Sequence, residues 1–199
     1  MQITELITAN YQFILELVCF VLGILSVWYA RKENILVYPT GLISTVITVY
    51  LLYLTKDLGN MLVNIYFSFM SIYGWYNWKF GKTKNESVLK ITTTSFKEKL
   101  VGCFLMLGTF ILVYFIYRFF DYSVTQDTYL DLVTTCIFFT AMWYMANKKI
   151  ESWVLWVVGN TLVVPLYFYK EWYLLATQYI IFTILAVLAF KDWKKSLDV

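Results

Sequence analysis

The chain has 199 residues, of which 60% are hydrophobic and only 15% are charged. Soluble domains are usually about 45–50% apolar and about 25% charged, so this composition excludes an ordinary soluble domain. There is no His, and the three Cys form no C-x-x-C pair, which argues against a metal site or a disulfide framework. Without His no Ser-His-Asp set can form, and neither a P-loop nor an HExxH pattern occurs. We therefore expect no catalytic residues, no metal, no cofactor and no nucleic-acid partner.

Seven apolar segments follow one another along the chain, each near the roughly 20 residues that a transmembrane helix needs. They are Tyr11–Ala30, Ile35–Leu54, Leu58–Trp78, Lys99–Phe120, Thr128–Ala146, Ser152–Tyr169 and Trp172–Phe190. The second and sixth contain Pro39 and Pro165, which membrane helices tolerate where neighbours satisfy the freed backbone groups. No basic stretch precedes the first segment, so we expect it to be retained rather than cleaved as a signal peptide. The sequence predicts an all-α integral membrane protein embedded in the lipid bilayer.

The basic residues predict the orientation of these helices. Thirteen of the 16 Lys and Arg fall in one set of alternate loops, and the other set holds only Lys56, Arg118 and Lys170. Loops rich in Lys and Arg stay in the cytoplasm. We therefore expect the N-terminus outside and the C-terminus in the cytoplasm, with a bacterial inner membrane as the natural setting.

The two ends of the chain resemble each other, which predicts an internal repeat. The matched positions are Glu16-Leu17-Val18 with Asp131-Leu132-Val133 and Val27-Trp28-Tyr29 with Met142-Trp143-Tyr144, both 115 residues apart; Tyr38 and Gly41 with Trp156 and Gly159, 118 apart; and Lys56-Asp57 with Lys170-Glu171 and Asn64 with Gln178, 114 apart. We expect two three-helix repeats, residues 1–79 and 128–199. Residues 80–127 would hold a solvated Lys-rich linker and a fourth helix, which gives both repeats the same orientation. The interface between parallel repeats is a known location for transporter substrate sites.

The sixth segment carries the strongest candidate site. Trp153, Trp156 and Asn160 follow at i, i+3 and i+7, so two indoles and one amide share a helical face. Indole faces stack on flat heterocycles or hold cations, and an amide supplies hydrogen-bond donors and acceptors. The alternative is an interfacial aromatic belt with the amide bonded to a neighbouring helix. At the offset of 118 the counterparts are Ile35, Tyr38 and Leu42, and this asymmetry favours substrate binding.

A polar and aromatic stripe runs along one face of the third segment: Asn60, Asn64, Ser68, Ser71, Trp75 and Trp78. Such a stripe lines a cavity or a helix–helix seam. Trp78 adjoins Lys79 and is interpreted as a belt residue, and Asn60 as a helix cap. Asn64 and its counterpart Gln178 are deeper and are expected to contact a ligand.

Carboxylates also recur near the outer ends of the first and fifth segments. Glu16 and Asp131 match at the offset of 115, and an acid inside a membrane suggests function by default. Because both could reach the interface, we interpret them first as structural and second as attracting a cationic substrate.

The W-x-x-W-x-x-x-N pattern of the sixth segment, together with Tyr73-Gly74-Trp75-Tyr76-Asn77-Trp78, resembles the Pnu vitamin transporters, above all the branch that carries nicotinamide riboside. The resemblance covers essentially the whole chain. It implies a 3+1+3 fold like that of the SWEET sugar transporters, a homotrimer, and facilitated diffusion of an unphosphorylated vitamin that a cytoplasmic kinase then traps. It also implies that Trp153, Trp156 and Asn160 bind substrate, and position and polarity add Gln178, Asn64 and Tyr66.

These observations predict passive uptake of nicotinamide riboside by alternating access, without enzymatic activity. Thiamine is the main rival substrate, because it is also flat and cationic, and riboflavin and deoxynucleosides follow. A membrane sensor or assembly factor without transport is a different class, which a sealed apolar repeat interface would favour. A channel would need a more polar lining than these helices provide.

Overall fold

A computed structural model describes residues 2–54, 58–83, 87–119 and 126–197. Its elements are seven helices: α1 (Gln2–Arg31), α2 (Val37–Leu54), α3 (Leu58–Phe80), α4 (Phe96–Phe119), α5 (Gln126–Ala146), α6 (Glu151–Tyr169) and α7 (Tyr173–Leu197). The predicted number, order and approximate bounds of the helices are confirmed. Helix α1 begins earlier than expected and α7 continues past the expected end. Of the matched residues named above, Lys56 and Asp57 lie outside the described ranges, as does Lys84 among the thirteen loop cations.

Six of the seven helices are long and apolar enough to cross a membrane, and α3 is the exception. The polar residues of the stripe on α3, including Asn64 and Ser68, lower its mean hydropathy. Its 23 residues still measure about 35 Å, which exceeds the roughly 30 Å hydrocarbon core. Among the described residues, α3 is set apart by the hydropathy of a membrane-length window and not by its length.

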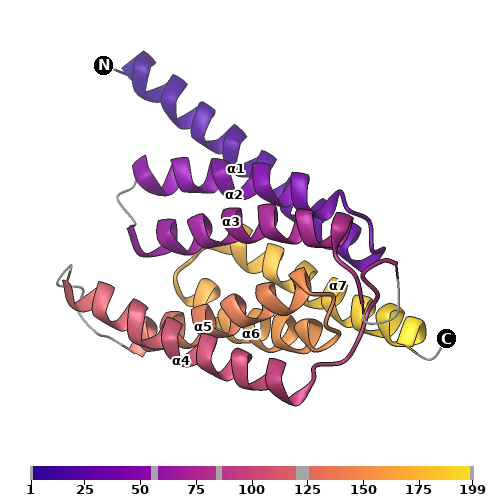
Figure 1. The fold of residues 1–199 in the computed structure, drawn as a ribbon. Coiled ribbons are helices and arrows are strands. Elements are labelled where there is room, and N and C mark those ends of the chain that lie inside the picture. The colour runs from indigo at the N-terminus through magenta and orange to yellow at the C-terminus, as the bar shows by residue number, and fades with distance from the viewer. Residues whose placement is uncertain (1, 55–57, 84–86, 120–125, 198–199) are drawn as a thin grey trace.

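Six helices pack in a closed ring, with α4 outside it. Helix α1 contacts α2, α2 contacts α3, α3 contacts α5, α5 contacts α6, α6 contacts α7, and α7 returns to α1. Helix α4 packs on α5 and touches α3 only slightly. Figure 1 shows α1, α2 and α3 on one side of the bundle and α4, α5 and α6 on the other, while the N-terminal part of α1 projects beyond its neighbours. Two seams, α1–α7 and α3–α5, join α1, α2 and α3 to α5, α6 and α7.

The turn that ends α1 recurs 115 residues later at the end of α5. Glu33 and Lys148 both adopt left-handed backbone, with φ of 52° and 49°. The N–H of Glu33 donates to the carbonyl of Ala30, and the N–H of Lys148 donates to that of Met145. The hydrogen bonds that begin α2 and α6 keep the same spacing, because Tyr38 N–H donates to Ile35 and Trp153 N–H donates to Ile150.

This spacing corrects the expected offset of 118 between α2 and α6. At 115 residues, Trp153 matches Tyr38, whereas Trp156 matches Gly41 and Asn160 matches Thr45. The sequence matches near Gly41 are three residues out of register, because short aromatic–glycine patterns fit by chance on an apolar helix. In the corrected register, Trp153 and Tyr38 occupy matched positions and both are aromatic. Trp156 and Asn160 have no similar side chain at their matched positions.

The sequence predicted a solvated linker before α4, but part of this linker is buried. Ile91 and Thr94 are buried. Thr92 N–H donates to the Lys148 carbonyl and Ile150 N–H donates to the Thr92 carbonyl, so the linker lies along the α5–α6 turn as a short parallel bridge. Side chains add to this contact, because Lys149 donates from Nζ to Thr92 Oγ1 at 2.9 Å and Thr94 N–H donates to Glu151 Oε1 at 2.8 Å.

Trp78, predicted to belong to an interfacial belt, is partly buried and packs against the core of the bundle. Its indole N–H donates to the Met145 carbonyl at 3.2 Å. Its ring meets that of Tyr38 edge-on, with centroids 5.1 Å apart. The core of the bundle at this end also contains Ala30, Trp153 and Trp193, each at most 1% exposed.

Candidate functional site

Helix α6 brings two partly or fully buried polar groups to one face. Trp156 and Asn160 are four residues apart, so their side chains lie one above the other. Asn160 is 2% exposed. The Oδ1 atom of Asn160 and the Nε1 atom of Trp156 are buried and find no hydrogen-bond partner among the described residues. A buried polar atom left unpaired costs about 1–3 kcal/mol, so a ligand that pairs with both would recover that free energy.

The ring of Trp156 is flanked by aromatic side chains from two other helices. Phe138 of α5 lies roughly parallel to it, with centroids 5.4 Å apart and planes inclined by 27°. Phe67 of α3 lies 6.3 Å away, inclined by 47°. A side chain at Gly159 would collide with the ring of Phe138, so glycine is required there for the close contact between α5 and α6. The surroundings suit a flat, apolar-faced ligand.

Tyr66 extends this aromatic group on the α3 side. Its hydroxyl donates to the Phe139 carbonyl at 2.9 Å, and its ring stacks on Phe139 with centroids 3.7 Å apart. Phe67 lies 6.1 Å from Phe139. The rings of α3, α5 and α6 therefore form one continuous group, which we call the aromatic group: Tyr66, Phe67, Phe138, Phe139 and Trp156.

Trp153 is placed differently from Trp156, although the sequence put both in one motif. Its side chain is fully buried and meets Trp193 of α7 edge-on, with centroids 5.3 Å apart and planes at 89°. Its Nε1 atom has no partner among the described residues. The ring is thus used in packing, and only the indole N–H remains available to a ligand.

The two remaining candidates make hydrogen bonds elsewhere. Gln178 on α7 donates from Nε2 to the Phe20 carbonyl of α1 at 3.3 Å. Asn64 donates from Nδ2 to the Asn60 carbonyl, one turn back on α3, at 2.9 Å. Each keeps its amide oxygen as an acceptor, but the hydrogen bonds hold Gln178 at the α1–α7 seam and Asn64 to its own helix.

The carboxylate of Asp131 has a structural partner. Lys170 donates from Nζ to Asp131 Oδ2 at 3.1 Å, and both side chains remain partly exposed. Glu16 is exposed. This pairing agrees with the structural interpretation of Asp131.

Sequence reasoning missed Phe67, Phe138 and Phe139. An isolated Phe on an apolar helix gives no signal that separates a ligand contact from the core or from a lipid contact. The corrected offset would have marked Phe138, because its counterpart is Gly23. A large ring opposite a glycine is a strong departure from the repeat.

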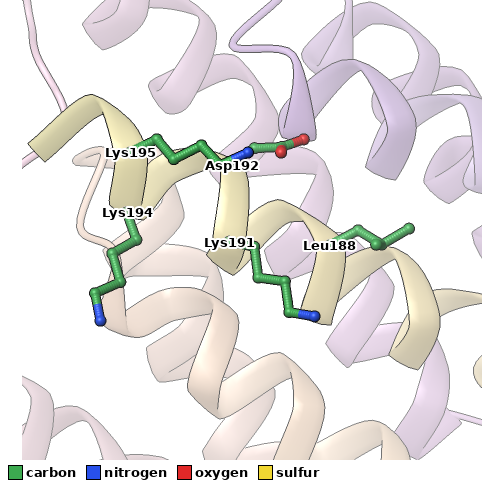
Figure 2. Close-up of a pocket in the computed structure, with 5 residues that line it drawn as sticks. All are labelled: Leu188, Lys191, Asp192, Lys194 and Lys195. Atoms are coloured by element: carbon green, nitrogen blue, oxygen red, sulfur yellow. The ribbon is translucent and has the colours of Figure 1, made fainter.

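A surface pocket near the C-terminal end of α7 lies apart from these rings (Figure 2). Its lining comprises Leu188, Lys191, Asp192, Lys194 and Lys195. Figure 2 shows Lys191 and Lys194 pointing to one side of α7 and the Asp192 carboxylate to the other. Arg31 pairs with that carboxylate at 2.6 Å. The pocket presents cationic side chains at the bundle end and offers no flat aromatic surface.

Comparison with known proteins places the chain in a family. The family described as "Nicotinamide mononucleotide transporter" matches residues 13–195. The chain is 26% identical over 206 residues to the nicotinamide riboside transporter PnuC of Escherichia coli strain K12, covering 92% of this chain and 85% of that protein. The match to PnuC of Shigella flexneri has the same identity and coverage.

A solved structure has the same fold. The crystal structure of the vitamin B3 transporter PnuC superposes with a TM-score of 0.74 at 22% identity, over 98% of this chain and 86% of that one. This likeness confirms the all-helical architecture. The expected resemblance to the Pnu transporters is therefore confirmed, and the chain belongs to the nicotinamide mononucleotide transporter family of multi-pass membrane transporters, which are not enzymes.

Proposed function

We propose that this protein carries nicotinamide riboside across the membrane by facilitated diffusion, binding it at the aromatic group. One observation carries this proposal. The Trp156 ring, stacked against Phe138, has a buried Nε1 atom without a hydrogen-bond partner among the described residues, and so does the nearby Oδ1 atom of Asn160. The relatives named above are nicotinamide riboside transporters.

The chemistry of the ligand fits these groups. A pyridinium ring is flat and cationic, and a cation against an indole face gains about 0.5–2 kcal/mol. Asn160 Oδ1 would accept a hydrogen bond from the carboxamide or from a ribose hydroxyl. The N–H groups of Trp153 and Trp156 would donate to ligand oxygen atoms. Tyr66 would hold the far side of the aromatic group, and the amide oxygens of Gln178 and Asn64 would complete the polar lining.

The site favours the riboside over its phosphorylated form. Binding a phosphate inside a bundle calls for Arg, Lys or several N–H donors. The proposed ligand contacts are Trp153, Trp156, Asn160, Gln178, Asn64 and Tyr66, all of them uncharged. Nicotinamide mononucleotide would leave its charge unpaired there, so we expect it to bind far more weakly.

Thiamine remains the second candidate substrate, with riboflavin and deoxynucleosides behind it. Its thiazolium ring is also flat and cationic, so ring stacking alone does not discriminate. Hydrogen bonds between ribose hydroxyls and Asn160 would discriminate nicotinamide riboside from thiamine. A sensor or assembly role without transport is the other class, and the buried polar atoms of α6 argue against the sealed apolar interface that it would need.

We propose that the helices form two parallel repeats, residues 1–79 and 128–199, joined by residues 80–127 in a 3+1+3 arrangement. The 115-residue recurrence of the turns supports this. So do the two seams, since α1–α7 and α5–α3 are equivalent contacts if the halves are exchanged. Helix α3 would then be the seventh span, with its polar face turned toward the other half.

Transport would proceed as one half rocks against the other, exposing the site to each side in turn. Gly41, Gly159, Pro39 and Pro165 are places where local bending would be absorbed. The protein would lie in a bacterial inner membrane as a homotrimer, with its N-terminus outside and its C-terminus in the cytoplasm. Phosphorylation by a cytoplasmic kinase would retain the product.

Calorimetric titration of the purified protein tests the substrate. We expect nicotinamide riboside to bind at least about 100-fold more tightly than nicotinamide mononucleotide, which corresponds to about 2.7 kcal/mol. Thiamine and riboflavin serve as matched flat ligands without a nicotinamide ring. Equal or tighter binding of thiamine would replace the substrate while keeping the site, and no heat with any of these ligands would reject the site.

A further inference from the structure

Two equivalent indole hydrogen bonds join the halves of the bundle at the end where α1 and α5 terminate. Trp78 of α3 donates from Nε1 to the Met145 carbonyl of α5 at 3.2 Å. Trp193 of α7 donates from Nε1 to the Ala30 carbonyl of α1, also at 3.2 Å. The two donors, Trp78 and Trp193, are 115 residues apart, and so are the two acceptors, Ala30 and Met145. An equivalent bond therefore closes each seam.

The rings of these tryptophans form a continuous buried layer. Trp78 meets Tyr38 edge-on and Trp193 meets Trp153 edge-on, with interplanar angles of 88° and 89°. Trp78 and Trp193 themselves approach to 6.1 Å. Tyr38, Trp153 and Trp193 are each at most 1% exposed. Trp78 is partly buried against these three side chains, so little of the layer is exposed to solvent.

An ion pair crosses between the two halves beside this layer. Lys148 Nζ donates to Glu33 Oε2 at 3.0 Å, and these are the two left-handed residues that end α1 and α5. Lys148 is 9% exposed, and its Nζ also lies 4.8 Å from the centre of the Trp78 ring. One cation of the second half thus holds both the α1–α2 turn and α3 of the first half.

Further contacts at the same end repeat across the two seams. Arg31 pairs with Asp192 at the α1–α7 seam, and Asn77 donates from Nδ2 to the Ala146 carbonyl at the α3–α5 seam at 2.9 Å. Asn77 and Asp192 are again 115 residues apart. Both seams are tied at one end, so neither can part there without losing equivalent bonds.

We propose that this layer is the gate at the Lys-rich end of the transporter, closed in this structure, and we call it the latch: Ala30, Glu33, Trp78, Met145, Lys148 and Trp193. Movement of one half against the other breaks the ion pair and both indole bonds together. The latch has two discrete states for that reason. Trp153 packs on Trp193 and lies one turn from Trp156, so it links the latch to the aromatic group. This inference rests on the proposed transport function.

Charge reversal at the ion pair, read by cysteine labelling, tests the latch. The parent is the full-length protein with Cys19, Cys103 and Cys136 replaced by Ala. Met145→Cys reports on the latch, since Met145 is 5% exposed, and Ala176→Cys at the opposite end of the bundle is the matched reporter. The purified oligomer is labelled with a bulky polar maleimide, without ligand, in the Glu33→Lys, Lys148→Glu and doubly reversed backgrounds.

We expect each single reversal to speed labelling at position 145 by about fivefold or more, since it replaces an attraction by a repulsion at a half-buried pair. The double reversal should restore the parent rate within about twofold, and position 176 should not label faster in any background. Unchanged rates at 145 in both single reversals, or a double variant as fast as the singles, would overturn the latch. Faster labelling at both positions would mean general loosening of the fold and would also overturn it.

Failure of the latch and failure of the proposed function give different results. Labelling rates are measured without ligand and do not depend on which vitamin binds. Titration of the parent with nicotinamide riboside is run beside them. Absent binding with the expected labelling pattern would count against the substrate alone, whereas normal binding without that pattern would count against the latch alone.

Discussion

The proposed latch and the proposed substrate site occupy the same bundle but relate differently to its two proposed halves. In the latch, Trp78 and Trp193 make the same bond, and the edge-on ring pairs have nearly the same geometry. At the proposed site, the residues 115 positions before Trp156 and Asn160 are Gly41 and Thr45, which resemble neither of them. Two equivalent seams are closed by the same contact made twice. One asymmetric ligand is bound by contacts that each occur once. The symmetry of a residue therefore indicates whether it serves movement and packing or recognition.

The largest effect should come from a substitution at the proposed substrate site, whose residues have no similar counterpart in the other half. Trp156→Ala should weaken nicotinamide riboside binding by about 100-fold, or about 2.7 kcal/mol, since truncation of a central aromatic hot spot costs about 2–4 kcal/mol. Calorimetric titration measures it, with size-exclusion chromatography to verify the oligomer. Trp75→Ala, at an exposed indole on α3, is the matched control and should leave affinity unchanged. Equal affinity of the Trp156 variant and the parent would remove the stacking role.

Asn160→Leu should weaken binding by about 30-fold, or about 2 kcal/mol, while thermal stability stays equal or rises. The reason is that Oδ1 is buried without a hydrogen-bond partner among the described residues, so an apolar residue of similar size relieves a cost in the free protein. Affinity and the melting temperature are measured on the same preparation. A clear fall in melting temperature at unchanged affinity would show that the amide holds helices together instead of binding ligand.

Gly159→Ala should lower the free energy of unfolding by about 1.5 kcal/mol, within the usual range for an overpacked core. The added methyl group would meet the ring of Phe138 and push α5 from α6. Gly108→Ala on α4 is the matched control, because nothing lies within 4 Å of its added methyl group. Thermal unfolding in detergent compares the two. Similar melting temperatures for both variants would mean that the α5–α6 contact is looser than the structure places it.

The smallest expected effects come from the two equivalent tryptophans of the latch. Trp78→Phe and Trp193→Phe each remove one indole N–H donor and keep an aromatic ring. Each should cost about 1 kcal/mol of stability, the usual net contribution of one hydrogen bond. Because the bonds are equivalent, the two shifts in melting temperature should agree. A shift in only one variant would break the symmetry on which the comparison depends.

Much of the fold could be predicted from the sequence because lipid imposes a simple rule. Apolar runs of membrane length gave seven helices in the right order, and only the polarity of α3 sets it apart. The proposed repeat has a spacing of 115 residues between the first and fifth segments, and the turns that end α1 and α5 recur at that same spacing. The register of α6 was wrong, since backbone hydrogen bonds in the turn fix it and no side chain reports them.

The site was predicted less completely for a physical reason. Trp156 and Asn160 stand out by polarity on an apolar helix, and the structure places both on one buried face. Phe138 and Phe67 have no such polarity, and only three-dimensional packing brings them to Trp156. Trp153 shared the motif but packs on Trp193 of the latch. Trp78 looked interfacial beside Lys79, yet its partner carbonyl lies 67 residues away.

Uptake of labelled nicotinamide riboside into liposomes containing the purified protein tests the central claim most directly. The account predicts rapid entry that stops when the internal concentration equals the external one, and loss of that entry in the Trp156→Ala variant. Entry no faster than into protein-free liposomes, or unchanged entry with Trp156→Ala, would contradict it.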